Sequence, residues 1–498
     1  MLFNSFDFML FFPIAVSIYF IVPSRVRYIW LLITSYCFYM GWNPKYALLI
    51  AVSTVITFLS GLLIDYISVH RIPRVYKKWV VAGSFIINIG ILVFFKYFNF
   101  LFYNINALLT HIGLFPIHKS FDVILPVGIS FYTFQALSYT VDVYRNDIKA
   151  EKNLLKYALF VSFFPQLVAG PIERSKNLLN QINHAEKTEL WNYRRITSGA
   201  VLMLWGLFQK MVIADRASII VDHVYDLYWM YGSIELILAT VLFALQVYCD
   251  FASYSMIAVG AARIMGFELM ENFNTPYFAR SVKEFWRRWH ISLSTWFRDY
   301  LYIPLGGSRC SATKKYRNLM ITFLVSGLWH GASWNFIIWG GVHGIYQVTG
   351  DIIRPLKERL NKKWNVKTQS FSYKTGQIMI TFLLVDFAWI FFRTDSLADS
   401  FLFISRIATH FNPWTLFDQS LYTLGLNQQE IHILLAAAAV LLFVDLIRYR
   451  KKKTLDIFLE EQCIWFRWGI LFFLFFFILI FGMYGPAFDA KQFIYFQF

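Results

Sequence analysis

The chain has 498 residues, of which 58% are hydrophobic, 20% are aromatic and only 15% are charged. Soluble domains carry about 25% charged residues, so this composition excludes an ordinary soluble protein and predicts a polytopic α-helical membrane protein. The formal net charge of +16 does not indicate nucleic-acid binding. Its lysines and arginines occupy short loops between apolar segments, the pattern that orients membrane proteins with their basic loops in the cytoplasm.

The first half of the chain is predicted to cross the membrane repeatedly. Apolar stretches of about 20 residues span the hydrocarbon core, and shorter ones need their polar flanks to complete a span. No cleavable signal peptide is expected, because the first apolar run follows Asp7, lacks a basic region before it and continues into a second span. The expected spans lie near residues 6–23, 28–43, 46–68, 79–96, 122–144, 197–214 and 233–260.

Two further segments are predicted to enter the membrane and return to the same side. Leu154–Ala169 is apolar but is broken by Pro165, Gly170 and Pro171, and a basic stretch follows it. The second such segment lies between residues 319 and 350. The remaining spans are expected near residues 376–394, 430–447 and 465–484, which gives ten to twelve crossings and places both termini outside the cell.

The long segment 267–318, predicted to lie on the cytoplasmic side, combines aromatic and basic side chains at helical spacing. One interpretation is an amphipathic helix that anchors the chain in the membrane interface. The other is a basic vestibule for an anionic donor, such as an acyl-carrying cofactor with phosphates, since guanidinium groups bind phosphate oxygens through paired donors. On such a helix, one face would hold Phe285, Trp289, Ser292 and Trp296, and another face would hold Arg287 and Arg288. The candidate donor-binding residues are Arg287, Arg288, Arg298, Trp289 and Trp296.

A histidine, His330, stands in an apolar run that is otherwise free of ionisable groups from Leu319 to Trp339. A helix that enters the membrane at Leu319 is about 15 Å long by Leu328, half of the ~30 Å hydrocarbon core. His330 is therefore predicted to lie near the midplane, where Gly331 and the small residues after it let the chain turn. An ionisable group at that depth is by default a functional-site candidate.

His330 is predicted to act as a general base, because a desolvated imidazole stays neutral and can take the proton of a hydroxyl acceptor. The alternative is a buried, hydrogen-bonded structural histidine. His290 and His343 also stand out, but a metal site needs at least three converging ligands, so no metal is predicted. The four cysteines have neither disulfide nor zinc spacing. Asp250 and Asp386 are interpreted as residues that make polar contacts between helices.

Five motifs spread over nearly the whole chain support a more specific prediction. They are Trp329-His330-Gly331, Arg287–His290 with Ser292–Trp296, Tyr300–Gly307, Pro126–Gln135 and Phe164–Arg174. In combination they resemble the membrane-bound O-acyltransferase superfamily, and within it the bacterial polysaccharide O-acetyltransferases of the alginate and peptidoglycan type. The resemblance implies that His330 is the catalytic histidine and His290 a supporting one. It also implies a ring of helices around a central funnel, and we expect a single integral-membrane domain over residues 1–498.

The chain ends in an aromatic motif, residues 493–498, which is predicted to lie outside the cell. Taken alone, the motif is typical of an aromatic belt at the membrane interface. A similar motif with a central tyrosine ends the small partner peptide of the teichoic acid D-alanylation system, where the tyrosine is thought to carry the acyl group. The resemblance therefore implies that Tyr495 relays the acyl group. A phenol, with a pKa of ~10, leaves more readily than a sugar hydroxyl, so a relay divides one transfer into two easier steps.

These observations predict an enzyme of the bacterial inner (cytoplasmic) membrane that moves an acetyl group from acetyl-CoA outward to a cell-envelope or secreted polysaccharide. A separate extracytoplasmic, esterase-like (SGNH-type) transferase is the expected partner for the last transfer, and no nucleic acid is involved. One alternative is D-alanyl transfer from a carrier protein for teichoic acid modification. The other is a non-enzymatic transporter or flippase, whose broken helices would mark a substrate site at the midplane.

Overall fold

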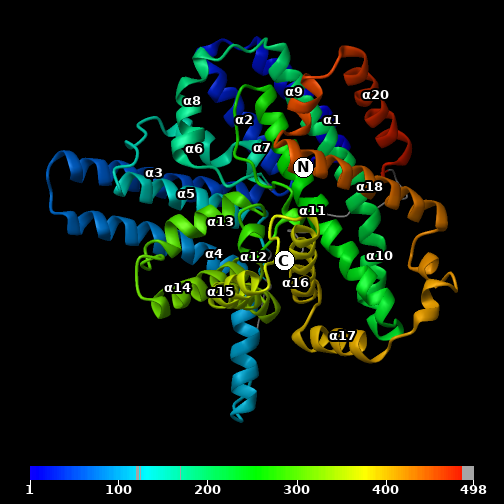
Figure 1. Ribbon diagram of the computed structural model, residues 1–498. Coiled ribbons are helices and arrows are strands. Elements are labelled where there is room, and N and C mark those ends of the chain that lie inside the picture. The colour runs from blue at the N-terminus through cyan, green and yellow to red at the C-terminus, as the bar shows by residue number, and fades with distance from the viewer. Residues whose placement is uncertain (119–122, 124, 169, 485–498) are drawn as a thin grey trace. The chain divides into compact units, whose positions relative to one another are not determined.

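The computed structural model describes residues 1–118, 123, 125–168 and 170–484. Within these residues the regular elements are helices and none is a strand, which confirms the predicted all-α fold (Figure 1). The chain divides into two compact units, one of Met1–Ala200 with Ile257–Met270 and the other of Val201–Met256 with Glu271–Phe498. The expectation of a single domain stays a prediction, as does the ring of helices around a funnel.

Seven helices in the described part of the chain are long and apolar enough to cross a membrane. Each of them overlaps a predicted span, which confirms a polytopic helical membrane protein. The first apolar helix, α1 (Phe6–Ile21), is shorter. The predicted total of ten to twelve crossings stays a prediction. The seven are Pro44–Val69, Arg74–His111, Tyr193–Asp226, Ser233–Ile264, Phe371–Arg393, Gln428–Lys451 and Ile464–Phe481.

The first unit contains one helix that differs clearly from its predicted span. Helix α4 (Arg74–His111) has 38 residues, whereas the apolar pattern predicts a span near residues 79–96. The pattern weakens at Lys96, but neither proline nor glycine follows until Gly113, so nothing interrupts the backbone hydrogen bonds of the helix. Helix α4 packs against α3 (Ala47–Val69) and α5 (Ile129–Tyr144).

The predicted break in the re-entrant segment is present in the first unit. Helix α6 (Leu154–Ser162) ends, and α7 (Phe164–Leu167) begins after a single non-helical residue, with proline in its first turn. The break frees the carbonyl of Phe160 from the helix. Two side-chain amides satisfy it, because Gln135 Nε2 and Gln166 Nε2 donate to this oxygen at 2.5 and 3.1 Å. These glutamines belong to two of the motifs quoted above, so the motifs pack against each other.

A buried carboxylate, Glu173, follows this break in the same unit. It accepts hydrogen bonds from the Met270 backbone N–H and from Asn177 Nδ2. Burial raises the pKa of Glu173 to about 7, although these hydrogen bonds act in the opposite direction. Glu173 thereby fixes the position of Met270, which follows α11 (Ser233–Ile264) in the chain and belongs to the same unit.

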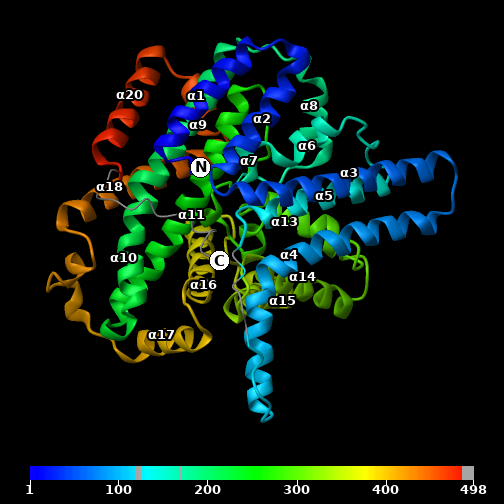
Figure 2. The same ribbon diagram turned by 180° about the vertical axis from the view of Figure 1, so that it is seen from behind.

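The second unit is built around a pair of tightly packed helices, α14 (Ala312–His330) and α15 (Trp334–Lys363). They lie side by side in both views (Figure 1, Figure 2). Glycine makes this close approach possible. A Cβ atom at Gly327 would lie 2.1 Å from the carbonyl oxygen of Phe336, and one at Gly340 would lie 2.3 Å from that of Phe323. The backbones therefore touch directly, as at small-residue interfaces of membrane helices.

Candidate active site

His330 is the last residue of α14, as the sequence predicts, and it is 2% exposed. Its ring lies among aromatic side chains. The ring centroids of Trp329 and Trp339 are each 5.0 Å away and nearly perpendicular, and that of Phe392 is 5.7 Å away. Edge-to-face packing of this kind restricts the orientation of the imidazole. His330 is therefore a positioned and desolvated group.

The chain turns away from His330 at Gly331, whose lack of a side chain is required by space. A Cβ atom there would lie 2.0 Å from the Phe336 ring. The φ angle of Gly331 is −158°, an extended conformation that any residue adopts. The absence of a side chain at Gly331 thus allows the Phe336 ring to pack against the backbone directly after His330.

His290 approaches His330 from a different part of the second unit. It is fully buried, and the two imidazole centroids lie 6.2 Å apart. The ring of Phe251, on α11, packs edge-on against His290 at 4.5 Å. Burial lowers the pKa of His290 well below its usual value, so its imidazole is neutral. The two imidazoles therefore lie close together, although 40 positions separate them in the sequence.

The backbone of His290 has a left-handed conformation, with φ of 43°, which is uncommon for a residue other than glycine. This conformation ends one short helix, α12 (Val282–Phe285) with its following turns, and precedes another, α13 (Ile291–Phe297). One of the two interpretations of this segment was an amphipathic helix, and the structure divides the segment between two short helices. Strained backbone of this kind is often found at functional sites.

Asn272 holds the left-handed turn in place. Its backbone carbonyl accepts from the N–H of Ile291 at 3.0 Å. Its side-chain oxygen accepts from the Ser292 N–H and hydroxyl at 3.2 and 2.9 Å, and its amide donates to Ser255 Oγ on α11 at 3.0 Å. Asn272 thus links α11 to the residues directly after His290. No sequence motif pointed to this asparagine.

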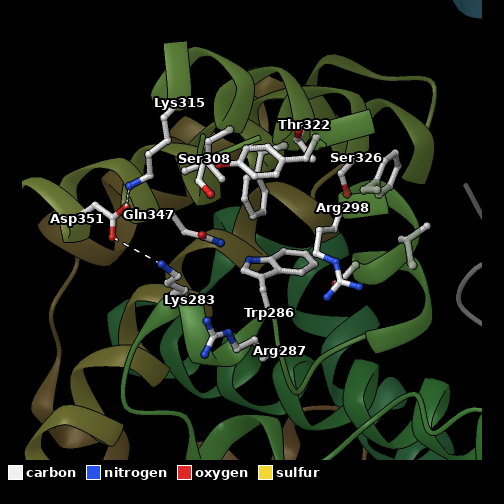
Figure 3. A pocket seen from close by; sticks show the side chains of 16 residues that line it. Lys283, Trp286, Arg287, Arg298, Ser308, Lys315, Thr322, Ser326, Gln347 and Asp351 are labelled. Atoms are coloured by element: carbon white, nitrogen blue, oxygen red, sulfur yellow. Dashed lines mark hydrogen bonds and ion pairs between the residues drawn. The ribbon is translucent and has the colours of Figure 1, made fainter. Parts of the chain in front are cut away.

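The same unit contains a cavity of about 360 Å³ (Figure 3), lined by residues of the segments that carry the two histidines. Its lining is strongly basic, because four cationic side chains and one carboxylate contribute to it, together with aromatic groups such as Trp286. The charged lining residues are Lys283, Arg287, Arg298, Lys315 and Asp351.

The predicted donor-binding residues divide between the cavity and its surroundings. Arg287 and Arg298 line the cavity. Arg288 is not among the lining residues, and its guanidinium instead contacts Glu284 at 2.8 Å. Trp289 and Trp296 are buried in the aromatic core of the unit. The sequence pattern did not single out the roles of Lys315 and Asp351, which come from neighbouring helices.

Two residues of the cavity lining are close in the chain to the two histidines. Ser326 lines it and lies one helical turn before His330 on α14. Ser294 also lines it, and its backbone N–H donates to the carbonyl of His290 at 2.9 Å. Each histidine therefore lies one helical turn along the chain from a residue that lines the cavity.

His343 lies near the same cavity but has a different environment. Its Nδ1 accepts a hydrogen bond from Trp286 Nε1 at 3.2 Å. Since Trp286 lines the cavity, His343 orients part of the cavity wall. Among the described residues no group of three or more His, Cys, Asp or Glu side chains is arranged to hold a metal ion.

A buried charge cluster in the second unit was not anticipated. Lys210 Nζ lies 2.6 Å from Asp250 Oδ1 and 2.9 Å from Asp215 Oδ1, and the three side chains are at most 4% exposed. Lys210 belongs to a π-helical turn, Gln209–Ala214, of the kind often found at functional positions. Asp250 was predicted to make a polar contact between helices, and Lys210 is its partner.

Tyr495 falls within residues 485–498, outside the described residues. Its assignment as an acyl relay stays a prediction.

The basic cavity and paired histidines fit the results of comparison with known proteins. The family model described as membrane-bound O-acyltransferase matches residues 145–383, which include His290, His330 and the whole cavity. A probable alginate O-acetylase of Pseudomonas aeruginosa is 37% identical over 450 residues, which cover 90% of this chain and 82% of that protein. The chain belongs to the membrane-bound O-acyltransferase family.

Two further relatives place the acyltransferase within its family. A peptidoglycan O-acetyltransferase of Helicobacter pylori is 35% identical over 422 residues, 78% of this chain and 76% of that protein. A teichoic acid D-alanyltransferase of Bacillus subtilis is 27% identical over 293 residues, 56% of this chain and 71% of that protein. The acyltransferase thus falls in the O-acetyltransferase branch. It is a multi-pass membrane enzyme, which sets aside the non-enzymatic transporter.

Proposed function

We propose that this membrane O-acyltransferase moves an acetyl group from cytoplasmic acetyl-CoA to its own Tyr495, for O-acetylation of a cell-envelope or secreted polysaccharide. The proposal rests on a basic cavity whose lining includes residues one helical turn along the chain from two buried histidines. The names of its relatives, which include alginate and peptidoglycan O-acetylating proteins, support an acetyl donor and a polysaccharide destination.

The cavity suits a thioester that carries phosphates. Arg287 and Arg298 present guanidinium groups, which bind phosphate oxygens through paired donors. Trp286 forms an apolar wall between the charged ends of the cavity (Figure 3). A donor bound in this cavity would extend its thioester toward Ser326 and the histidines.

His330 acts as the general base in this proposal. It takes the proton of the acceptor hydroxyl, and the resulting oxygen attacks the thioester carbonyl. The carbon–sulfur bond then breaks, and the proton on His330 passes to the leaving sulfur. The products are an acetyl ester and free CoA, so no other reactant is needed. The neutral imidazole of His290 supports the reaction by donating a hydrogen bond toward the developing oxyanion.

Tyr495 is the proposed first acceptor, on the outer side of the membrane where the positive-inside pattern places both termini. An extracytoplasmic, esterase-like partner then transfers the acetyl group to the polysaccharide. D-alanyl transfer from a carrier protein is less favoured, because the D-alanyltransferase relative is less similar and covers less of this chain than the O-acetylases.

The donor site is tested by removing the guanidinium groups. Arg287→Gln and Arg298→Gln are each expected to raise the KM for acetyl-CoA by about 10- to 100-fold, because a hydrogen bond to a charged group contributes about 1.5–3 kcal/mol. Initial rates of CoA release by the purified enzyme provide the measurement. Arg309→Gln, an exposed arginine outside the cavity lining, serves as the control. An unchanged KM in both cavity variants would exclude this site.

The relay is tested at the C-terminus. After incubation with acetyl-CoA, peptide mass spectrometry is expected to find an acetyl group on Tyr495, and Tyr495→Phe is expected to abolish polysaccharide O-acetylation because it removes the acceptor oxygen. Tyr484→Phe, a nearby exposed tyrosine, is the matched control and should retain acetylation. Wild-type acetylation of the polymer by Tyr495→Phe would refute the relay.

A further inference from the structure

A carboxylate lies inside the basic cavity, between two lysines from different helices. Asp351, on α15, is 2.5 Å from Lys315 Nζ on α14 and 3.8 Å from Lys283 Nζ on α12. Burial alone would raise the pKa of Asp351, but the hydrogen bond from Lys315 and the charge of Lys283 hold it below its usual value. Asp351 is therefore ionised and paired with both lysines.

These three residues form one end of the cavity. Figure 3 shows Lys283, Lys315 and Asp351 at one end and Arg298 with Ser326 at the other, with Trp286 between them. Since Ser326 lies one helical turn before His330 on α14 and Lys315 lies near the start of that helix, the lysine end is the one farther from His330. A donor with its thioester at Ser326 would place its more distant phosphates among the lysines.

Helix packing gives little reason for the Asp351 carboxylate. The backbones of α14 and α15 already touch at Gly327 and Gly340, and partly exposed ion pairs contribute little to stability. A carboxylate in a cavity for anions also repels the ligand that the cavity is built to bind. Its position is better explained by what it does to the two lysines while the cavity is empty.

We propose that Lys283 and Lys315 form a phosphate subsite for the donor, and that Asp351 occupies this subsite until a phosphate group displaces it. The inference rests on the proposed function and deepens it. In the empty enzyme the carboxylate holds the two ammonium groups close together. A doubly charged phosphate group competes with the carboxylate for them better than a singly charged anion does. Asp351 is thus a specificity-determining residue that weakens the binding of every anion at this subsite, and weakens that of phosphate groups less than that of singly charged anions.

The test compares two donors, acetyl-CoA and the uncharged thioester S-acetyl-N-acetylcysteamine. Asp351→Asn removes the competing charge, so the KM for acetyl-CoA relative to that for the uncharged donor is expected to fall about fivefold, as expected for an ion pair worth ~1 kcal/mol. Lys283→Gln and Lys315→Gln should raise the same ratio. Glu358→Gln, an exposed carboxylate on the same helix outside the cavity lining, should leave it at the wild-type value.

Binding of CoA without turnover separates this inference from the proposed function. Calorimetric titration of the purified full-length enzyme with CoA and with dephospho-CoA should show tighter binding of both in Asp351→Asn. The subsite would be overturned by an Asp351→Asn variant whose KM ratio is not lower than that of wild type and whose affinity for CoA is not higher. The proposed acetyl transfer would be unaffected by that result. A wild-type enzyme that binds CoA in the predicted way but never releases it from acetyl-CoA would instead overturn the proposed function.

Discussion

Replacing His330 by alanine is expected to lower the rate of acetyl transfer by about 100- to 10,000-fold, the usual contribution of a general base. The imidazole lies one helical turn beyond Ser326, which lines the cavity, and its aromatic neighbours keep it in one orientation. Alanine leaves the acceptor hydroxyl without a base, while the surrounding tryptophans keep their own contacts. CoA release by purified protein, normalised to folded protein in detergent, provides the measurement.

Two matched variants show whether the effect is specific. His343→Gln keeps a hydrogen-bond acceptor for Trp286 and is expected to retain most of the activity, although His343 is as deeply buried as His330. His290→Ala is expected to be impaired because it removes the supporting imidazole. Full activity of His330→Ala, with normal yield of folded protein, would show that another group is the base.

Replacing Lys210 by methionine is expected to destabilise the protein by about 3–5 kcal/mol. Methionine fills a similar volume but leaves the carboxylates of Asp250 and Asp215 buried without their ammonium partner, and breaking a buried ion pair has a cost of this size. The effect is measured as a lower thermal unfolding temperature and a lower yield of monodisperse protein in detergent.

Two further variants test whether the loss of stability in Lys210→Met comes from the unpaired carboxylates. Adding Asp250→Asn to Lys210→Met removes one of the unpaired charges and is expected to restore part of the lost stability. Lys362→Met, an exposed lysine on α15, is expected to have almost no effect. An unchanged unfolding temperature in Lys210→Met would mean that water or another group compensates the two carboxylates.

Features that depend on neighbours in the sequence were predictable for this protein. A run of apolar residues long enough for the hydrocarbon core predicts a membrane helix, and all seven long apolar helices follow such runs. Pro165 predicts the break between α6 and α7, and the small residues after His330 predict the end of α14. The motifs that resemble the O-acyltransferases were also sufficient for the family.

Features that depend on distant residues were not predictable. The pattern around Trp289 and Trp296 suggested one helix, because spacing cannot reveal that His290 has a left-handed backbone held by Asn272. For a similar reason the sequence could not show that only some of the candidate arginines line the cavity. Arg287 and Arg288 are neighbours in the chain, but the turn between α12 and α13 directs them to different surroundings.

Hydropathy and motif therefore established a helical membrane acyltransferase with His330 as its leading candidate, because both are local properties of the chain. The meeting of His330 with His290, the basic cavity beside them and the position of Asp351 between two lysines emerged only in three dimensions. Each of these depends on the close packing of helices from separate parts of the second unit. That packing involves backbone contact at Gly327 and Gly340 and the left-handed backbone of His290, and neither feature produces a periodic pattern in the sequence.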